Sequence, residues 1–324
     1  MSNFKRIVRN KVKELAFSRR YSLMPRKRKG KPVLIIMFDN KIMHGGLLDR
    51  IKGIISAAAI AKAKRFEFKI FTDTTFPLFK FLKPVDTFLQ AKQVDVLYNR
   101  WLSKPVVMYN FLSKDKGKLL KPFSITKQQF HFYFNTNVLG LFYPSNNQKE
   151  SDALWRKAFL EIFSFDDFFQ QQFNSLFNYG DAVCGIHLRF VSLLGDFIEV
   201  TNTPLPEPDK SILVTKCLDQ IQKIMELHPG NKFLIVSDSG YFLTCVKEHF
   251  SIAYHTKRIT VLDGSIAHID VDHSEEVLKK ALLDFYLLSR CKNIYQVLGE
   301  RMYNSQFSKY AAILGDAEYT VCKV

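Results

Sequence analysis

The sequence predicts an α/β protein made of two domains, each built on a parallel sheet. The chain has 324 residues, which is long enough for two domains with separate cores. Short runs of β-branched and aromatic residues alternate along it with amphipathic stretches of helical spacing. This alternation is typical of parallel sheets, because a helix connects one parallel strand to the next. The predicted parts are a basic tail and linker at residues 1–31, an N-terminal domain at 32–179 and a C-terminal domain at 180–324.

The first 30 residues carry most of the positive charge. The formal net charge is +16, and this segment holds eleven basic residues against a single acidic one, Glu14. Apolar residues are interleaved at near-helical spacing: Phe4, Ile7, Val8, Val12, Leu15 and Phe17. Such a segment is typical of helices that bind an anionic membrane surface. A solvated, disordered arm is the alternative. RNA binding is a weaker interpretation, because no nucleic-acid-binding module accompanies the tail.

The first predicted strand, residues 33–37, leads into a glycine-containing polar turn. His44, Gly45 and Gly46 form this turn, and an amphipathic helix begins at Leu47. Paired glycines let the backbone approach a ligand closely, and the amides at a helix start favour an anion. An ordinary strand-to-helix connection has the same spacing. The polar residues in and after the turn, His44, Asp49 and Arg50, favour a ligand site.

The rest of the first half is less regular. A second strand is predicted at 66–71, whereas residues 76–145 break the pattern and receive no function. One helix is expected to start at Ser151-Asp152 and another after Asp166-Asp167. The two adjacent carboxylates could hold a metal, but an acidic helix start is the favoured interpretation. Residues 178–181 interrupt this helix and mark the predicted domain boundary.

The second half begins with a buried strand, residues 182–189, that ends in two polar side chains. His187 and Arg189 lie two residues apart and therefore share a face of the strand. Ligands of open α/β sheets bind beyond the carboxyl ends of the strands, which is where these residues stand. The alternative is a pair that only forms surface ion pairs.

Further helices and strands alternate to the end of the chain. A helix is predicted at 211–227, a strand at 233–236 that ends in Ser237, Asp238 and Ser239, and a strand at 258–262. A helix after Ser274, a strand at 294–297 and a last helix through residues 307–314 follow. Hydroxyl groups at the final strand-to-helix junction can bind phosphate together with the helix N-terminus. Ser305, Gln306, Phe307 and Ser308 occupy that junction.

One segment allows a different chemistry. Asp270-Val271-Asp272 has the spacing of a metal-binding Asp-x-Asp motif. The residues that follow, Ser274-Glu275-Glu276, are typical of a helix start, so these acids are interpreted as loop and cap residues.

Three of these motifs, in order, resemble motifs of GDP-fucose-dependent fucosyltransferases. The motifs are Gly45-Gly46-Leu47-x-Asp49-Arg50-x-x-Gly53, His187-x-Arg189 and Ser305-x-Phe307-Ser308. The likeness is to the nodulation α1,6-fucosyltransferases, their bacterial relatives and, more loosely, the protein O-fucosyltransferases. Two positions depart from the family: Leu48 stands where a third glycine is usual, and Phe190 where a second arginine is common.

The resemblance implies two Rossmann-like domains facing a cleft, as in GT-B glycosyltransferases. It also implies inverting transfer of fucose from GDP-fucose to a glycan acceptor, with no metal and no further cofactor. Arg189 would contact the β-phosphate, and Asp49 would orient or deprotonate the acceptor hydroxyl. The expected donor-binding residues are His44, Gly45, Gly46, Arg50, His187, Asp238, Ser239, Ser305, Gln306, Phe307 and Ser308. Two alternatives remain: transfer from another nucleotide sugar, such as GDP-mannose or a UDP-sugar, and a non-catalytic protein with this fold.

The sequence also predicts where the protein works. It contains no run of eighteen apolar residues and no apolar core of a signal peptide near its start. Its five cysteines are scattered without a Cys-x-x-Cys pair, which indicates reduced thiols rather than disulfides or a zinc site. We therefore expect a cytoplasmic protein at the inner face of a bacterial inner membrane. Lipid-linked glycans or surface polysaccharide precursors would be its acceptors.

Overall fold

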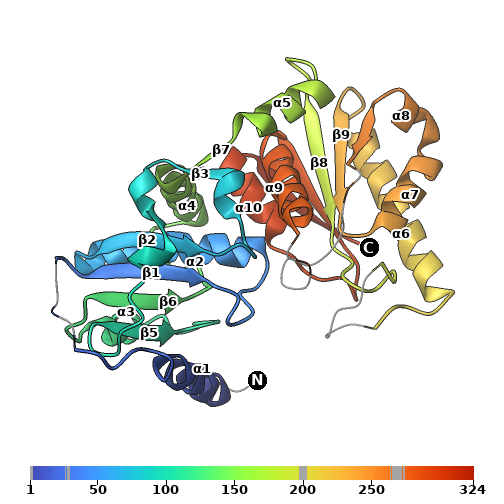
Figure 1. Ribbon diagram of the computed structural model, residues 1–324. Coiled ribbons are helices and arrows are strands. Elements are labelled where there is room, and N and C mark those ends of the chain that lie inside the picture. The colour runs from blue at the N-terminus through green and yellow to red at the C-terminus, as the bar shows by residue number, and fades with distance from the viewer. Residues whose placement is uncertain are drawn as a thin grey trace. The chain divides into compact units, whose positions relative to one another are not determined.

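The computed structural model describes residues 3–25, 27, 30–196, 203–262, 264, 272 and 274–324. The chain divides into two compact units, Met1–Ser164 (unit 1) and Phe165–Val324 (unit 2). Each unit contains one five-stranded sheet flanked by helices (Figure 1). The predicted α/β class with two parallel sheets is confirmed.

The sheet of unit 1 has the strand order β4-β2-β1-β6-β5, and its strands pair in parallel. Its strands are β1 (Val33–Phe38), β2 (Glu67–Thr72), β4 (Gln90–Ala91), β5 (Ser103–Val107) and β6 (Gln129–Tyr133). Its helices are α1 (Asn3–Ser18), α2 (Leu47–Lys64), α3 (Lys116–Leu120) and α4 (Gln148–Ile162), with short 3-10 turns at Leu78–Lys80, Thr87–Leu89, Gln93–Asp95, Lys121–Phe123 and Leu139–Leu141. A separate two-stranded sheet joins β3 (Leu82–Pro84) to β7 (Phe163–Phe165).

The sheet of unit 2 has the order β10-β9-β8-β11-β12, again with parallel pairing. Its strands are β8 (Val183–Leu188), β9 (Lys232–Ser237), β10 (Ile259–Val261), β11 (Asn293–Leu298) and β12 (Glu318–Lys323). Its helices are α5 (Asp167–Leu176), α6 (Asp209–Leu227), α7 (Gly240–His249), α8 (Ser251–His255), α9 (Glu275–Ser289) and α10 (Phe307–Gly315). The predicted strands and helices of this half are confirmed, whereas α7, α8 and β12 were not predicted.

The boundary between the units lies earlier than the predicted 179/180. Helix α5 belongs to unit 2 because its aromatic face packs on α9: the ring centroids of Phe169 and Tyr286 are 5.7 Å apart, and Tyr286 Oη donates to Gln170 Oε1 at 2.7 Å. Asp166 caps this helix by accepting from the amide of Phe168, so the interpretation as an acidic helix start is confirmed.

Two further local predictions differ from the structure. Helix α4 begins at Gln148, before the start predicted at Ser151-Asp152, because Asn147 caps it. The side chain of Asn147 accepts from the amide of Glu150 and donates to the carboxylate of Glu150. The unassigned region 76–145 contains β5 and β6. Strand β6 sits beside β1 in the middle of the sheet, and it was missed because polar side chains such as His131 are buried in it.

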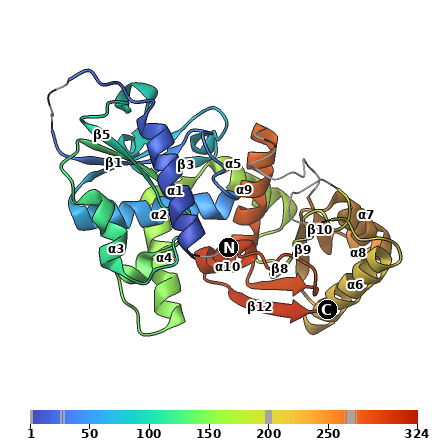
Figure 2. The ribbon, with the colours of Figure 1, turned by 90° about the horizontal axis from the view of Figure 1, so that it is seen from below.

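Helix α1 is an integral part of unit 1, not a separable tail. Figure 1 shows it next to β5, the strand at one edge of this unit's sheet, and Figure 2 shows it from below. Phe17 is buried in a core cluster with Ile35, Met37 and Tyr133, and Glu14 Oε1 accepts from the backbone amide of Val107 at 3.0 Å. The prediction of a tail and linker detached from the fold is therefore wrong for this helix.

The exposed side of α1 carries both apolar and basic side chains. Ile7, Val8, Val12 and Leu15 are between 44% and 62% exposed, whereas Glu14 and Phe17 on the opposite side are buried. The side of the helix that meets the sheet carries Phe17 and Glu14, and most of its other apolar side chains face outward.

Candidate functional site

The topology of unit 2 has a switch point at β8. From β8 the chain builds outward through β9 to β10, and it then crosses to the other side of β8 to form β11 and β12. Crevices of open α/β sheets lie at such a switch point, beyond the carboxyl ends of the strands. His187 on β8 pairs in register with Gln296 on β11, so both residues lie at this switch point.

Arg189 follows β8 directly at this edge. Its Nε atom lies 3.4 Å from Oδ2 of Asp238, and its side chain is 23% exposed. Its backbone oxygen accepts from the amide of Tyr303, in the loop between β11 and α10. The guanidinium is thus held at the sheet edge by one carboxylate and still reaches the surface.

Asp238 fixes the backbone that carries Arg189. Its two carboxylate oxygens accept from the amides of Phe190, at 2.7 Å, and Val191, at 2.8 Å. Val191 has φ of +59°, a left-handed conformation that is rare for a β-branched residue. Burial raises the pKa of Asp238, and Arg189 together with the two amides opposes that rise. Asp238 is therefore occupied by protein donors, and it positions Arg189.

Ser239 is likewise engaged inside unit 2. Its hydroxyl caps α7 by accepting from the amide of Phe242 at 3.0 Å, and it donates to Asp196 Oδ2 at 2.6 Å. Asp196 also accepts from the amide of Tyr241. The side chain of Ser239 is fully buried, so its contacts are those of a helix cap.

His187 is buried and meets the start of α10. Its Nδ1 atom lies 3.1 Å from Oγ of Ser308, and its ring packs on Phe307 with centroids 5.4 Å apart. Burial, with a smaller effect of Arg189, lowers the pKa of His187 to about 3. The imidazole is therefore neutral at physiological pH. The structure brings together His187, Phe307 and Ser308, which belong to two of the three motifs.

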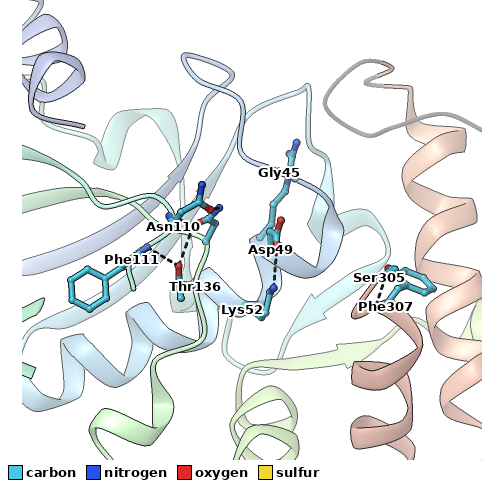
Figure 3. A network of polar contacts seen from close by, with 10 residues as sticks. Gly45, Asp49, Lys52, Asn110, Phe111, Thr136, Ser305 and Phe307 are labelled. Carbon is cyan, nitrogen blue, oxygen red and sulfur yellow. Dashed lines mark hydrogen bonds and ion pairs between the residues drawn. The ribbon is translucent and has the colours of Figure 1, made fainter. Parts of the chain in front are cut away.

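The loop before α10 presents Ser305 and Gln306. Ser305 Oγ accepts from the amide of Phe307 at 3.1 Å, which orders the first turn of the helix (Figure 3). Gln306 is exposed. The amides at this helix start follow the loop that leaves β11, the strand paired with β8.

In unit 1 the glycine-containing turn connects β1 to α2. Gly45 has φ of +82°, and a Cβ atom there would meet Asp49 Oδ2 at 2.9 Å. Arg50 is buried, donates from Nε to the oxygen of Gly45 at 3.0 Å and lies 4.3 Å from the ring of Phe76. Arg50 thus holds the turn from inside. Asp49 is 41% exposed and pairs with Lys52 at 2.7 Å (Figure 3).

His44 lies under this turn rather than at its surface. Its Nδ1 atom is 2.8 Å from Oη of Tyr109, and its ring stacks on Tyr133 with centroids 6.3 Å apart. Its side chain is 3% exposed. Its observed role is to connect the turn to the ends of β5 and β6. Gly53 permits a second close contact, because a Cβ atom there would lie 2.2 Å from the oxygen of Phe134.

Sequence reasoning missed a polar cluster at the switch point of unit 1. Asp39, the first residue after β1, accepts from Tyr133 Oη at 2.9 Å and pairs with Lys41 at 3.0 Å. Lys41 Nζ also donates to Tyr98 Oη at 3.2 Å. Asp39 lies two residues after the predicted strand 33–37, which was the signal that could have found it.

Amide side chains line the neighbouring rim. Asn110 and Asn135 exchange hydrogen bonds, and the amide of Phe111 donates to Thr136 Oγ1 at 3.1 Å (Figure 3). These residues follow β5 and β6. Amide side chains at a sheet edge can bind sugar hydroxyls, because they offer both donors and acceptors.

The alternative Asp-x-Asp motif falls largely outside the described residues, which omit Asp270 and Val271. Asp272 is described, and its Oδ1 accepts from the amide of Ser274, the cap of α9. Among the described residues, no three His, Cys, Asp or Glu side chains gather as metal ligands. Within the same part of the chain, no helix is both long and apolar enough to cross a membrane.

The chain resembles solved fucosyltransferase structures. No protein-family model and no curated protein matches it. Two structures of NodZ alpha-1,6-fucosyltransferase, one soaked with GDP-fucose and one co-crystallised with GDP, each match with a TM-score of 0.51 and 15% identity, over 88% of this chain and 93% of that chain. A selenomethionine structure of NodZ from Bradyrhizobium matches with a TM-score of 0.50 and 14% identity over the same shares.

The chain has a GT-B-like fold. The likeness spans both units, and it confirms the fold that the three motifs predicted. At 15% identity the match supports the architecture, and the contacts described above place the individual residues.

Proposed function

We propose that this protein is a glycosyltransferase that transfers fucose from GDP-fucose to a glycan acceptor, with inversion and without a metal. The observation that carries the proposal is Arg189, a partly exposed guanidinium held at the switch point of unit 2. The fold is shared with NodZ, whose structures were obtained with GDP-fucose and with GDP. Membership of the same fold and a cationic group at the expected phosphate position support the same donor.

The proposed chemistry needs positive charge where GDP departs. The bond between fucose and the β-phosphate oxygen breaks as the acceptor oxygen attacks the anomeric carbon, so negative charge grows on the phosphate. The guanidinium of Arg189 can donate two hydrogen bonds to phosphate oxygens, and the amides at the start of α10 add their dipoles. Groups already fixed at the site stabilise the developing charge without reorganisation. Ser305, Gln306 and Ser308 complete this diphosphate site in our assignment.

The two proposed donor residues Asp238 and Ser239 take a different role from the one expected. Both are occupied by protein hydrogen bonds, so we assign them to holding Arg189 and α7 in place. By the same reasoning, Arg50 and His44 hold the turn that exposes Gly45 and Gly46. The backbone of this turn is our candidate for contact with the donor in unit 1.

For the acceptor we assign Asp49 to orient or deprotonate the attacking hydroxyl. Its carboxylate is 41% exposed and is paired only at one oxygen with Lys52 in the described contacts. Asp39 is the other carboxylate at this edge, but its side chain is 4% exposed and already binds Tyr133 and Lys41. We therefore assign Asp39 to ordering the edge. The proton of the acceptor hydroxyl would be transferred to the carboxylate of Asp49.

Helix α1 supports a membrane-bound acceptor. Its outward side presents Val8, Val12 and Leu15, flanked at helical spacing by Lys5, Arg9 and Lys11. Glu14, the one acid of the helix, points to the sheet. Each basic residue near an anionic surface contributes about 1 kcal/mol, and the apolar side chains can enter the interface. We propose that α1 binds the cytoplasmic face of a bacterial inner membrane, where lipid-linked glycans or surface polysaccharide precursors would be acceptors.

A donor screen tests this function directly. Thermal unfolding would be followed with GDP-fucose, GDP-mannose, UDP-sugars, CMP-sugars and dTDP-sugars, followed by assays for sugar transfer or hydrolysis with every stabilising donor. A ligand at one hundred times its Kd stabilises by about 2.7 kcal/mol, which is readily seen. We expect GDP and GDP-fucose to stabilise and fucose to be turned over. If a different nucleotide sugar stabilises the protein, that sugar would be the donor instead of GDP-fucose. GDP binding without any turnover would indicate a non-catalytic protein.

A further inference from the structure

Three large apolar side chains from two segments of unit 1 form an exposed patch. Leu23 and Met24 follow α1, and Trp101 precedes β5; their exposed fractions are 60%, 72% and 61%. The two segments lie side by side, because Ser22 and Asn99 form a parallel β-bridge. Trp101 Nε1 also donates to the backbone oxygen of Leu23 at 2.8 Å. We call Leu23, Met24 and Trp101 the Trp101 patch.

Backbone oxygens of the patch are hydrogen-bonded within the protein. Besides the bond from the indole, the oxygen of Met24 accepts from Asn99 Nδ2 at 2.7 Å. Lys127 Nζ donates to the oxygens of Arg100 and Trp101, at 2.9 Å and 2.8 Å. A backbone oxygen that leaves water without another donor costs free energy. Because these oxygens already have donors, the patch can enter an apolar medium without leaving them unpaired.

The chain on both sides of the patch carries basic but no acidic residues. No Asp or Glu occurs in the sequence at residues 15–31 or 96–114. Arg19, Arg20 and Arg100 are exposed. Exposed apolar side chains among arginines complement an anionic lipid bilayer, whose headgroups attract the cations and whose interface accepts the apolar groups. Tryptophan is enriched at that interface because its ring is apolar and its N–H is polar.

We propose that the Trp101 patch is a second membrane contact of unit 1, which enters the interface of an anionic bilayer. It is separate from the outward side of α1, since that helix ends at Ser18. Two contacts would fix the orientation of unit 1 on the membrane, whereas a single amphipathic helix leaves rotation about its axis free. The inference deepens the proposed membrane association and rests on it, but it does not depend on the identity of the donor.

Tryptophan fluorescence observes the patch directly. The chain has two tryptophans, and Trp155 on α4 is only 1% exposed, so a quencher in the lipid can reach Trp101 but not Trp155. Full-length protein would be mixed with vesicles of equal parts phosphatidylglycerol and phosphatidylcholine, with or without bromine on the acyl chains. Emission and sedimentation would be measured on the same samples. We expect a shift of the emission to shorter wavelength and a loss of emission with the brominated lipid. Pure phosphatidylcholine vesicles, and the Trp101→Phe variant, should show neither change.

Leu23→Ser combined with Trp101→Ser measures the contribution of the patch to binding. We expect roughly 10-fold weaker binding to the anionic vesicles, because removal of a large apolar side chain from water corresponds to at least such a factor. The matched control is Val85→Ser combined with Phe88→Ser. These residues are 60% and 81% exposed and lie before β4, at the opposite edge of the sheet from β5. The control should bind as wild type does, and circular dichroism should show both variants folded.

The outcomes separate this proposal from the others. If wild-type protein sediments with brominated anionic vesicles and keeps its emission, the patch does not touch the bilayer, and the contact through α1 still stands. Equal binding of the patch variant and of wild type would also overturn the proposal. If wild-type protein does not sediment with anionic vesicles, both membrane contacts are wrong. Transfer to a soluble acceptor would then still test the proposed enzyme by itself.

Discussion

The Nε atom of Arg189 lies 3.4 Å from Oδ2 of Asp238, and the same carboxylate binds the two backbone amides that follow Arg189. One buried side chain therefore sets both the path of the chain and the direction of the guanidinium. It also supports the left-handed conformation of Val191. The geometry resembles that of sites in which a strained turn is held in place by surrounding contacts.

Replacing Asp238 should therefore lower turnover through Arg189. In Asp238→Asn one amide loses its acceptor and the ion pair loses its charge, so we expect the free energy of unfolding to fall by about 2 kcal/mol. We also expect kcat to fall well beyond what the loss of stability explains. Asp196→Asn is the control, since Asp196 supports the cap of α7 without touching the backbone of Arg189. Equal losses of kcat in both variants would show that Asp238 has no special role.

Membrane binding should depend on the outward side of α1. Deleting the helix would also remove Phe17 from the core, so substitution is the cleaner test. We expect Val8→Ser, Val12→Ser and Leu15→Ser together to abolish sedimentation with anionic vesicles while leaving turnover of a soluble acceptor intact. The control replaces three exposed apolar residues of unit 2: Ile212, Leu227 and Ile252. Vesicle binding that survives in the α1 variant would exclude this surface.

Chelation should leave turnover intact, because the proposed site supplies positive charge through Arg189 and helix amides. The measurement is fucose transfer before and after treatment with EDTA. Loss of activity that Mn²⁺ restores would instead favour the Asp270-Val271-Asp272 motif. In that case Asp270→Ala combined with Asp272→Ala should abolish activity, whereas our assignment expects this variant to remain active.

Stability should fall in acid because two buried histidines stay neutral. Burial lowers the pKa of His131 and of His187 to about 3, against about 6.5 in the unfolded chain. Between pH 6.5 and 3 the unfolded chain binds more protons, so the free energy of unfolding decreases as the pH falls, by up to about 1.4 kcal/mol per pH unit for each histidine.

Chemical denaturation at several pH values measures this slope. His131→Gln should reduce it for unit 1 and His187→Gln for unit 2, because glutamine keeps polar atoms at each site but does not titrate. An unchanged slope in the two variants would show that these histidines are not the cause.

Strands with polar residues only at their ends were predicted from the sequence, whereas a strand with polar residues inside it was not. The strand that ends in His187 and Arg189 is apolar up to its last residues, so the strand and its polar carboxyl end followed from one pattern. The strand β6 was missed because Gln129 and His131 break its apolar run. They are buried only because Tyr21, beyond α1, bonds to His131, and because Gln129 bonds to Leu97 and Asp95.

The roles of individual site residues were harder to predict than their locations. Asp238 and Ser239 stand where a ligand contact was expected, but both already have protein partners. Asp238 accepts from the amide of Phe190, and Ser239 caps its own helix and donates to Asp196. Arg50 and His44 were chosen as polar residues in a turn, and both are buried by Phe76 and Tyr109 from distant segments. A single sequence contains no signal for such long-range partners. It located the edges of the sheets, and the contacts then separated exposed groups from buried ones.

Arg189 provides the most direct test of the proposed function. Arg189→Ala and Arg189→Lys would be compared with wild type for kcat with GDP-fucose, for Kd of GDP and for folding by circular dichroism. We expect the alanine variant to remain folded and to lose on the order of 10²–10³ in kcat, as for the loss of one preorganised donor. The lysine variant should recover only part of that loss, because it keeps the charge without the bidentate geometry. Kd for GDP should rise less than kcat falls, since charge on the β-phosphate grows in the transition state. Near-normal kcat in folded Arg189→Ala would contradict the assignment of the donor site to this edge.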